Sequence, residues 1–325
     1  MKKYLFTLLA GLIGFSSSSQ TGESESILGQ DIKQGEKLLE AYFTPMAESF
    51  GAGLNNGWYN TAKPHSLGGF DLTFTLNTVI IPNAAESFKI GNEFGGVFTS
   101  TETEASSIFG ISDGTPMTYT NSTTSTDVDF NMPGGFKTAA LPLPMIQAGI
   151  GLIKNTAIDI RYMPMLNVGK SGDKSIKVNL FGVGLKHDIL QWIPVVGDAI
   201  PMSLSLQGGY TALNTKLKIS GQEVSLNTKA TTINLVASKR LLMFTGYAGV
   251  GYNSSTTSFS ADADFELSGN PGIKFEEKVQ MDFESKNNLR ANVGFRFNIT
   301  LVTIQADYTF SEYPTATLGL GVSLR

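Results

Sequence analysis

Cysteine is absent from this chain of 325 residues. A protein without cysteine has no disulfide framework and no thiolate metal site. It also cannot carry a lipid on a cysteine at a cleavage point. Its stability must therefore come from burial of apolar groups, from backbone pairing or from a surrounding bilayer.

Charged residues are also scarce. Asp, Glu, Lys and Arg make up 16% of the chain, against roughly 25% in ordinary soluble domains. The formal net charge is −4, and loss of the two positive charges of Lys2 and Lys3 would make it −6. Nucleic-acid binders usually have a basic patch, so this charge balance argues against a nucleic-acid partner.

The chain has one apolar run near its start and no long run after it. Tyr4–Phe15 follows two lysines, and small serines precede Gln20. This pattern predicts a secretory signal peptide over residues 1–19, with cleavage near Ser19. A membrane anchor is the alternative, but a spanning helix needs ~20 apolar residues. The later sequence contains no apolar stretch of that length.

The first part of the mature chain has helical spacing. Residues 27–54 predict a helix, and Pro45 is expected to break it into two pieces. Glycines 51, 53 and 57 indicate a loop after it. We assign residues 20–66 to an N-terminal helical segment that could plug a lumen, and residues 67–325 to a β-domain. The apolar positions of the helix are Ile27, Leu28, Ile32, Leu38, Leu39, Tyr42 and Phe43.

From Gly69 onward, apolar and polar residues alternate with a period of two. In residues 288–299, for example, one face is apolar and the other polar, and residues 301–310 repeat the pattern. A half-buried periplasmic sheet would also alternate. A transmembrane antiparallel β-barrel is favoured, because the segments match the ~9–11 residues of a spanning strand and because charged residues stand in mid-strand on the polar face.

The strand count is expected to be about twelve, within a range of 10–14. Short turns belong on the periplasmic side and longer loops outside, and both chain ends are placed in the periplasm. Eight strands follow Asn155 and one precedes it at 144–153. Residues 69–81 and 87–98 predict two more, and a third is expected in 103–130.

Six polar residues in these strands are candidates for lining a lumen. They are Asp159, Arg161, Arg290, Arg296, Gln305 and Asp307. Asp159 with Arg161, and Arg296 near Asp307, would create a transverse field in a narrow pore. A structural ion-pair network that holds the barrel interior together explains the same residues equally well. Apolar and lipid-facing positions on the opposite face include Val293 and Ile304, where arginine should impair assembly, whereas arginine at Asn292 should be tolerated.

The apolar segment 189–196 is unusual for a periplasmic turn. A short interfacial helix anchored by Trp192 explains it, and a surface for a partner protein is the alternative.

Catalytic motifs are weak. Ser112 stands in a GxSxG pattern, but that motif needs a strand-to-helix turn beside a histidine base, and its surroundings are a Ser/Thr/Gly loop. The two histidines, His65 and His187, have no spacing that indicates a metal site. We therefore expect no enzyme activity, catalytic residue, cofactor or metal, and an outer-membrane lipid hydrolase is only a remote alternative.

Three stretches, 41–51, 157–164 and 182–194, resemble a known family. The chain is similar to an uncharacterised outer-membrane β-barrel family of the Bacteroidetes, a domain of unknown function. The resemblance implies a barrel and no established site residues. The layout also resembles the long-chain fatty acid transporter barrels, although Arg325 stands where many outer-membrane barrels end in an aromatic residue.

The sequence therefore predicts a cell outer-membrane barrel that is a passive channel or transporter for small or hydrophobic molecules. The alternative is a structural or assembly component of the envelope, such as a secretion-machine subunit or scaffold. The expected partners are outer-membrane lipid or lipopolysaccharide, the barrel assembly machinery and a small-molecule substrate.

Overall fold

A computed structural model describes residues 22–111, 113–122, 124–132, 134–135, 137–171, 174–193, 201–219, 222–266, 274–285 and 288–324. The predicted signal peptide lies outside these residues. The chain forms two compact units. Unit 1 contains residues up to Met46, Ile81–Ala139 and Asp262–Met281, and unit 2 contains Ala47–Ile80, Ala140–Ala261 and Asp282–Arg325.

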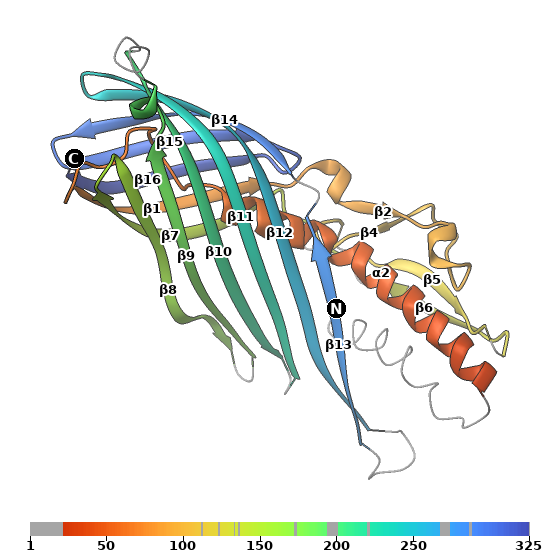
Figure 1. The fold of residues 1–325 in the computed structure, drawn as a ribbon. Helices are drawn as coiled ribbons and strands as arrows, with labels where there is room; N and C mark the ends of the chain where they lie inside the picture. Colours follow the sequence, from red (N-terminus) through yellow and green to blue (C-terminus); the bar gives the residue numbers. More distant parts are fainter. Residues whose placement is uncertain are drawn as a thin grey trace. The chain divides into compact units, whose positions relative to one another are not determined.

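Unit 2 is built on a closed antiparallel β-barrel (Figure 1). The strands of one sheet follow the order β11-β10-β9-β8-β7-β1-β16-β15-β14-β12-β13, and an additional pairing of β11 with β12 closes ten of the eleven into a ring. The ring strands are β1 (Phe70–Ile80), β7 (Ala140–Leu152), β8 (Thr156–Ser171), β9 (Lys174–Asp188), β10 (Ser203–Ile219), β11 (Gln222–Leu241), β12 (Phe244–Glu266), β14 (Leu289–Ile299), β15 (Val302–Phe310) and β16 (Thr315–Leu324). The eleventh strand, β13 (Lys274–Glu284), pairs with β12.

The ring has ten strands, at the lower end of the predicted range, because two predicted barrel strands lie elsewhere. The regions 87–98 and 103–130 form small separate sheets in unit 1. One pairs β2 (Ser87–Lys89) with β4 (Glu104–Ser106), and the other joins β3 (Phe98–Thr99), β5 (Thr115–Thr120) and β6 (Asp127–Met132). Strands of two to six residues are shorter than the ~9–11 residues that a bilayer requires.

The two ends of the barrel differ. At the short-turn end, β1 and β16 start and finish together, with Phe70 opposite Leu324. The β7–β8 connection at this end is a tight turn in which Lys154 and Asn155 both have positive φ. At the long-strand end, β10 and β11 stay paired as far as Ile219 and Gln222. Figure 1 shows β10, β11 and β12 as the longest strands of the ring.

The barrel wall is apolar on its outer face and polar on its inner face, the opposite of the arrangement in a soluble protein. Val293 is 53% exposed and Ile304 45% exposed, whereas Arg290 and Arg296 on the opposite face are 5% and 3% exposed. Soluble proteins rarely bury arginine or expose contiguous apolar surface. An apolar exterior around a polar interior is typical of a barrel in lipid.

The α-helix α2 (Gly22–Asn55) precedes the barrel and runs through Pro45. The predicted break at this proline is therefore wrong. Proline in a helix interior removes a backbone hydrogen bond and costs about 3 kcal/mol. Burial of Phe43 in unit 1 and of Ala47 in unit 2 offsets that cost, because both turns beside the proline are held by packing.

Unit 1 has a hydrophobic core of its own. The hydroxyl of Tyr42 donates to the carbonyl of Gly134 at 3.0 Å, and burial raises the pKa of Tyr42 to about 12. The other buried residues include Leu38, Leu39, Phe43, Phe94, Phe98, Ile108, Met117 and Met132.

Within the described part of the chain, no helix combines the length and the hydropathy that crossing a membrane requires.

Candidate functional site: the filled lumen of the barrel

Residues 54–66, called here the inner segment, run along the barrel lumen from the long-strand end to the short-turn end. At the first end, a Cβ on Gly53 would meet Val79 and Leu143, next to the ends of β1 and β7. At the other end, a Cβ on Gly151 would meet the carbonyl of Ser66. The chain then turns at Gly68–Gly69 and enters β1.

Helix α2 ends inside the barrel, where two wall arginines bind its last carbonyl groups. The Arg161 Nη1 donates to Leu54 O at 2.8 Å and its Nη2 donates to Asn56 O at 2.7 Å. Arg290 Nη1 donates to Asn55 O at 2.8 Å. The final carbonyls of a helix have no partner within it and attract positive charge. The arginines therefore satisfy this buried helix terminus.

Gly57 reverses the chain directly after the helix. Its φ of +73° lies in the left-handed region, and a Cβ there would stand 2.9 Å from the Asn77 Oδ1. The Asn77 amide donates both to Gly53 O at 2.8 Å and to Asn56 O at 3.0 Å. A left-handed glycine is a common helix terminator, and here it also leaves room for Asn77.

The Trp58 indole fills a recess in the barrel wall. A Cβ on Gly184 would lie 2.7 Å from the ring and a Cβ on Gly209 would lie 2.5 Å from it. The Arg161 guanidinium carbon sits 3.6 Å from the centre of the indole, a cation–π geometry. Trp58 is 1% exposed. These lumen-facing glycines therefore make the wall complementary to one side chain of the inner segment.

The residues after Trp58 are bound by the opposite side of the wall. The Tyr59 hydroxyl donates to the Asn292 Oδ1 at 2.7 Å, and Arg296 Nη1 donates to the Asn60 Oδ1 at 2.7 Å. The inner segment thus contacts β14 as well as β8, β9 and β10, so it is held across the lumen.

Near the short-turn end, small polar side chains bind the inner segment. Ser205 Oγ donates to Ala62 O at 2.5 Å, and the Ala62 amide donates to Ser238 Oγ at 2.9 Å. His65 Nε2 lies 2.9 Å from Asp71 Oδ1. The segment therefore has wall partners along its whole length.

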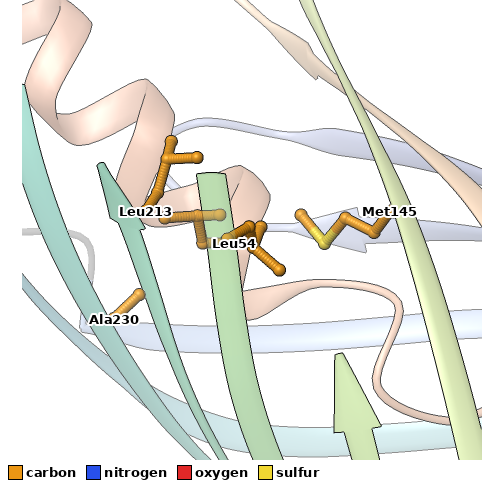
Figure 2. Close-up of a cluster of buried hydrophobic side chains, with 5 residues drawn as sticks. Leu54, Met145, Leu213 and Ala230 are labelled. Carbon is orange, nitrogen blue, oxygen red and sulfur yellow. The ribbon is translucent and has the colours of Figure 1, made fainter. Parts of the chain in front are cut away.

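An apolar layer surrounds the helix end toward the long-strand end. Figure 2 shows Leu54 between side chains from β7, β10 and β11, and the full cluster is Leu54, Met145, Leu180, Leu213 and Ala230.

Farther from the helix end, Tyr313 lies in the β15–β16 turn. Burial and the neighbouring carboxylate of Glu48 raise the pKa of Tyr313.

Two small cavities lie beside the inner segment among the residues that the structure describes. A cavity of about 10 Å³ lies between Trp58, Tyr59 and the wall, and another of about 60 Å³ lies nearer the short-turn end beside Thr61 and Arg296. A single buried water needs roughly 10–15 Å³. These spaces suit isolated waters and do not form a passage for a solute.

The structure places the six candidate lumen residues on the interior face, each at most 8% exposed. Arg161, Arg290 and Arg296 donate to the inner segment, as described above. Asp159 accepts from Gln147 at 3.3 Å, and Asp307 accepts from the Tyr247 hydroxyl at 3.0 Å. Gln305 lines the 10 Å³ cavity. The arginines thus bind a segment of the chain itself, a partner that neither hypothesis about these residues included.

Trp192 lies in a single turn of 3-10 helix, η3 (Leu190–Trp192), and is 60% exposed. Its Nε1 donates to the His187 Nε2 at 2.7 Å, and Thr156 Oγ1 lies 2.8 Å from the His187 Nδ1. Residues 194–200 and Ser112 lie outside the described residues. Among those described, no group of three His, Asp or Glu side chains could hold a metal.

The sequence analysis did not identify the residues whose oxygen atoms accept hydrogen bonds from the arginines. These residues are Leu54, Asn55, Asn56 and Asn60. Nothing in the pattern of Trp58, Tyr59 and Asn60 distinguishes a lumen segment from a surface loop. One available signal was glycine at lumen-facing positions of the strands, where alternation predicts a polar side chain. Gly184 is an example. Glycine within a strand can mark the close approach of another group.

A family model described as "Family of unknown function (DUF6588)" matches residues 1–324. A search of curated proteins found no match. Among solved structures, the chain is similar to the translocator domain of autotransporter NalP from Neisseria meningitidis, with a TM-score of 0.30, 11% identity, and coverage of 93% of this chain and 98% of that chain. It is also similar to the outer-membrane protease OmpT from Escherichia coli, with a TM-score of 0.36, 10% identity, and coverage of 83% and 100%. At these scores the likenesses do not indicate a function.

The predicted resemblance to a family of unknown function is confirmed by the family match. The Bacteroidetes origin and the likeness to long-chain fatty acid transporters stay predictions.

Proposed function

The chain belongs to DUF6588, a family of unknown function, and we propose from its own structure that it is an outer-membrane β-barrel sealed by its N-terminal chain. In this proposal it serves as a membrane anchor, and its resting state is not an open pore. The observation that carries the proposal is the inner segment, which occupies the lumen and is bound by the wall along its length.

The contacts of the inner segment favour a permanent occupant. Two arginines bind three successive carbonyls at the helix end, and the recess around Trp58 depends on glycines in two strands. Each buried polar group left without its partner costs about 1–3 kcal/mol. Withdrawal of the segment would break several such bonds at once, so spontaneous opening should be rare.

The exposed surface supports the membrane location. Apolar side chains cover the outside of β14, β15 and β16, including Val293, Ile304 and Leu318. Only helices and closed barrels satisfy all backbone groups in lipid. The proposed partners of the outer face are lipid and lipopolysaccharide, and the barrel assembly machinery is the proposed partner during insertion.

Conductance in planar bilayers tests the seal. The mature protein should give no current steps, whereas a variant lacking residues 22–66 should conduct, because its polar lumen would fill with water. Both proteins must first show the heat-dependent gel migration of a folded barrel. Steady conductance of the full-length protein, equal to that of the shortened variant, would rule out a sealed resting state.

A channel that opens by withdrawal of the inner segment is the second candidate. The polar wall favours it, because Lys186, Arg161, Arg290 and Arg296 would face water once the segment left. The Thr61 and Ser238 hydroxyl oxygens lie 3.1 Å apart, so cysteines at these positions could form a disulfide that holds the segment in place. If solute uptake by vesicles stops on oxidation and returns on reduction, the protein is a gated channel for small molecules.

We assign the chain no catalytic role in this proposal. His65 is bound to Asp71, and His187 is bound to Thr156 and Trp192, so both rings have structural partners. A lipid deacylation assay on the wild type and on His65→Ala and His187→Ala checks this. Activity above background that falls in either variant would show an enzyme.

A further inference from the structure

The inner segment has a direction, and that direction determines where the preceding chain leaves the barrel. Its contacts move steadily along the strands. Asn56 is bound by Asn77, three residues from the end of β1 at the long-strand end, while His65 is bound by Asp71, the second residue of β1. The N-terminal side of the segment is therefore at the long-strand end.

Three of the chain crossings out of unit 2, at residues 46–47, 80–81 and 139–140, occur at this same end. Helix α2 leaves the lumen there, next to Ser255 and Tyr313. Strand β1 ends there at Ile80, whose amide donates to Pro314 O at 2.8 Å, and β7 begins at Ala140, opposite Ile80. Residues 22–46 and 81–139 thus depart from the barrel end opposite to the one that contains Leu324.

The two ends of an outer-membrane barrel face different compartments. Periplasmic turns are short and external loops are longer. Here the tight turn at Lys154–Asn155 and both ends of the ring, Phe70 and Leu324, lie at the short-turn end. The extended hairpin of β10 and β11 lies at the other end. The long-strand end should therefore face the exterior of the cell.

We infer that the barrel passes its own N-terminal chain through its lumen and presents residues 22–46 and 81–139 at the cell surface. The inference rests on the proposed outer-membrane location and extends it to a display function. Unit 1 is suited to this role because it buries apolar side chains from separate parts of the chain, among them Leu38, Tyr42, Phe98 and Met117. The inner segment then has two tasks, to close the lumen and to connect the surface unit to the membrane.

Single cysteines can report the side of the membrane without interference, because the natural chain has none. The three variants are Lys33→Cys in helix α2, Glu312→Cys in the β15–β16 turn at the long-strand end, and Lys154→Cys in the tight turn at the short-turn end. All three side chains are exposed. Intact cells are treated with a membrane-impermeant maleimide before and after permeabilisation of the outer membrane, and each variant must keep the gel migration of a folded barrel.

Lys33→Cys and Glu312→Cys should be labelled on intact cells to within about twofold of each other, and Lys154→Cys should gain at least tenfold on permeabilisation. If Lys33→Cys behaves like Lys154→Cys, the N-terminal chain is periplasmic and the inference is overturned, although the barrel stays in the membrane. If Lys154→Cys is labelled and Glu312→Cys is not, the assumed orientation is wrong and the inference falls. Failure of the proposed function has a different signature, in which the protein fractionates with soluble periplasmic proteins and all three cysteines react alike.

Discussion

At the residue scale, the lumen depends on a few buried arginines whose partners are backbone carbonyls. Arg161 is completely buried, and its donors reach Gln147, Leu54 and Asn56. Alternation along β8 predicts the face on which such a residue lies, because every second side chain shares a face. It says nothing about the partner, since Leu54 and Asn56 are over a hundred residues away.

Arg161→Met should destabilise the folded barrel by about 3 kcal/mol, because at the buried helix end the Leu54 carbonyl would lose its side-chain donor and the Asn56 carbonyl one of its two. Unfolding by guanidinium in detergent, followed by tryptophan fluorescence, gives this value. Arg240→Met is the matched control, since Arg240 is exposed and donates only to the neighbouring Leu242 O, and it should change stability by less than about 0.5 kcal/mol. Equal effects of the two substitutions would contradict the proposed capping role.

Gly209→Val should destabilise the barrel by about 1–3 kcal/mol through overpacking against Trp58. The neighbouring Gly208 gives the control, because a Cβ there would meet no atom closer than 4.0 Å. Trp58→Ala should reduce the cost of Gly209→Val, since the two sites are in contact and their effects are not additive. A Gly209→Val protein that is as stable as Gly208→Val would mean that the recess does not hold the indole.

At the element scale, the helix and the barrel strands are the parts that sequence predicts well. Helical spacing indicates residues 27–54, close to the observed Gly22–Asn55, and four of the predicted apolar residues, Leu38, Leu39, Tyr42 and Phe43, are buried as the pattern requires. The predicted break at Pro45 is wrong, because the helix continues through the proline. Regions 87–98 and 103–130 do form strands, but these pair in small separate sheets and not in the barrel. Alternation shows the two faces of a strand and does not identify the strand with which it pairs.

Gly57→Ala tests how the helix ends. Any residue but glycine at a left-handed position costs about 1 kcal/mol, and at Gly57 a Cβ would also press on Asn77. Gly68→Ala separates the two causes, because Gly68 has a φ of +77° and nothing within 4 Å of a Cβ. Chemical denaturation should show a larger loss for Gly57→Ala. If both glycine variants lose the same stability, Asn77 has no part in terminating the helix.

At the scale of the whole molecule, the distribution of polarity decides where the protein belongs. The alternating pattern predicts both faces, as the exposure of Val293 and the burial of Arg296 illustrate. The alternation does not show which residues fill the lumen or which wall residues they contact, although residues 20–66 were expected to act as a plug. For that reason arginine at Asn292, which sequence suggests would be tolerated, is now expected to impair folding, because Asn292 accepts the hydrogen bond of Tyr59.

Arginine on the outer face of β14 or β15 should prevent stable insertion. Val293 and Ile304 stand in mid-strand and are exposed on the apolar face, and a cationic side chain at the bilayer midplane costs roughly 2–4 kcal/mol. Val293→Arg and Ile304→Arg should therefore lower the amount of folded barrel in the outer-membrane fraction, while Ile304→Leu should leave it unchanged.

A soluble β-protein that buried the same face would also fail on arginine substitution, so chemical access must separate the two cases. Cysteines at positions 293 and 304 face lipid if the barrel spans a bilayer. They should react with a lipid-soluble maleimide in native membranes and resist a water-soluble one, because the hydrocarbon region excludes the polar reagent. A folded protein that reacts equally with both reagents, or that leaves the cell with the soluble periplasmic proteins, does not have this face in a membrane.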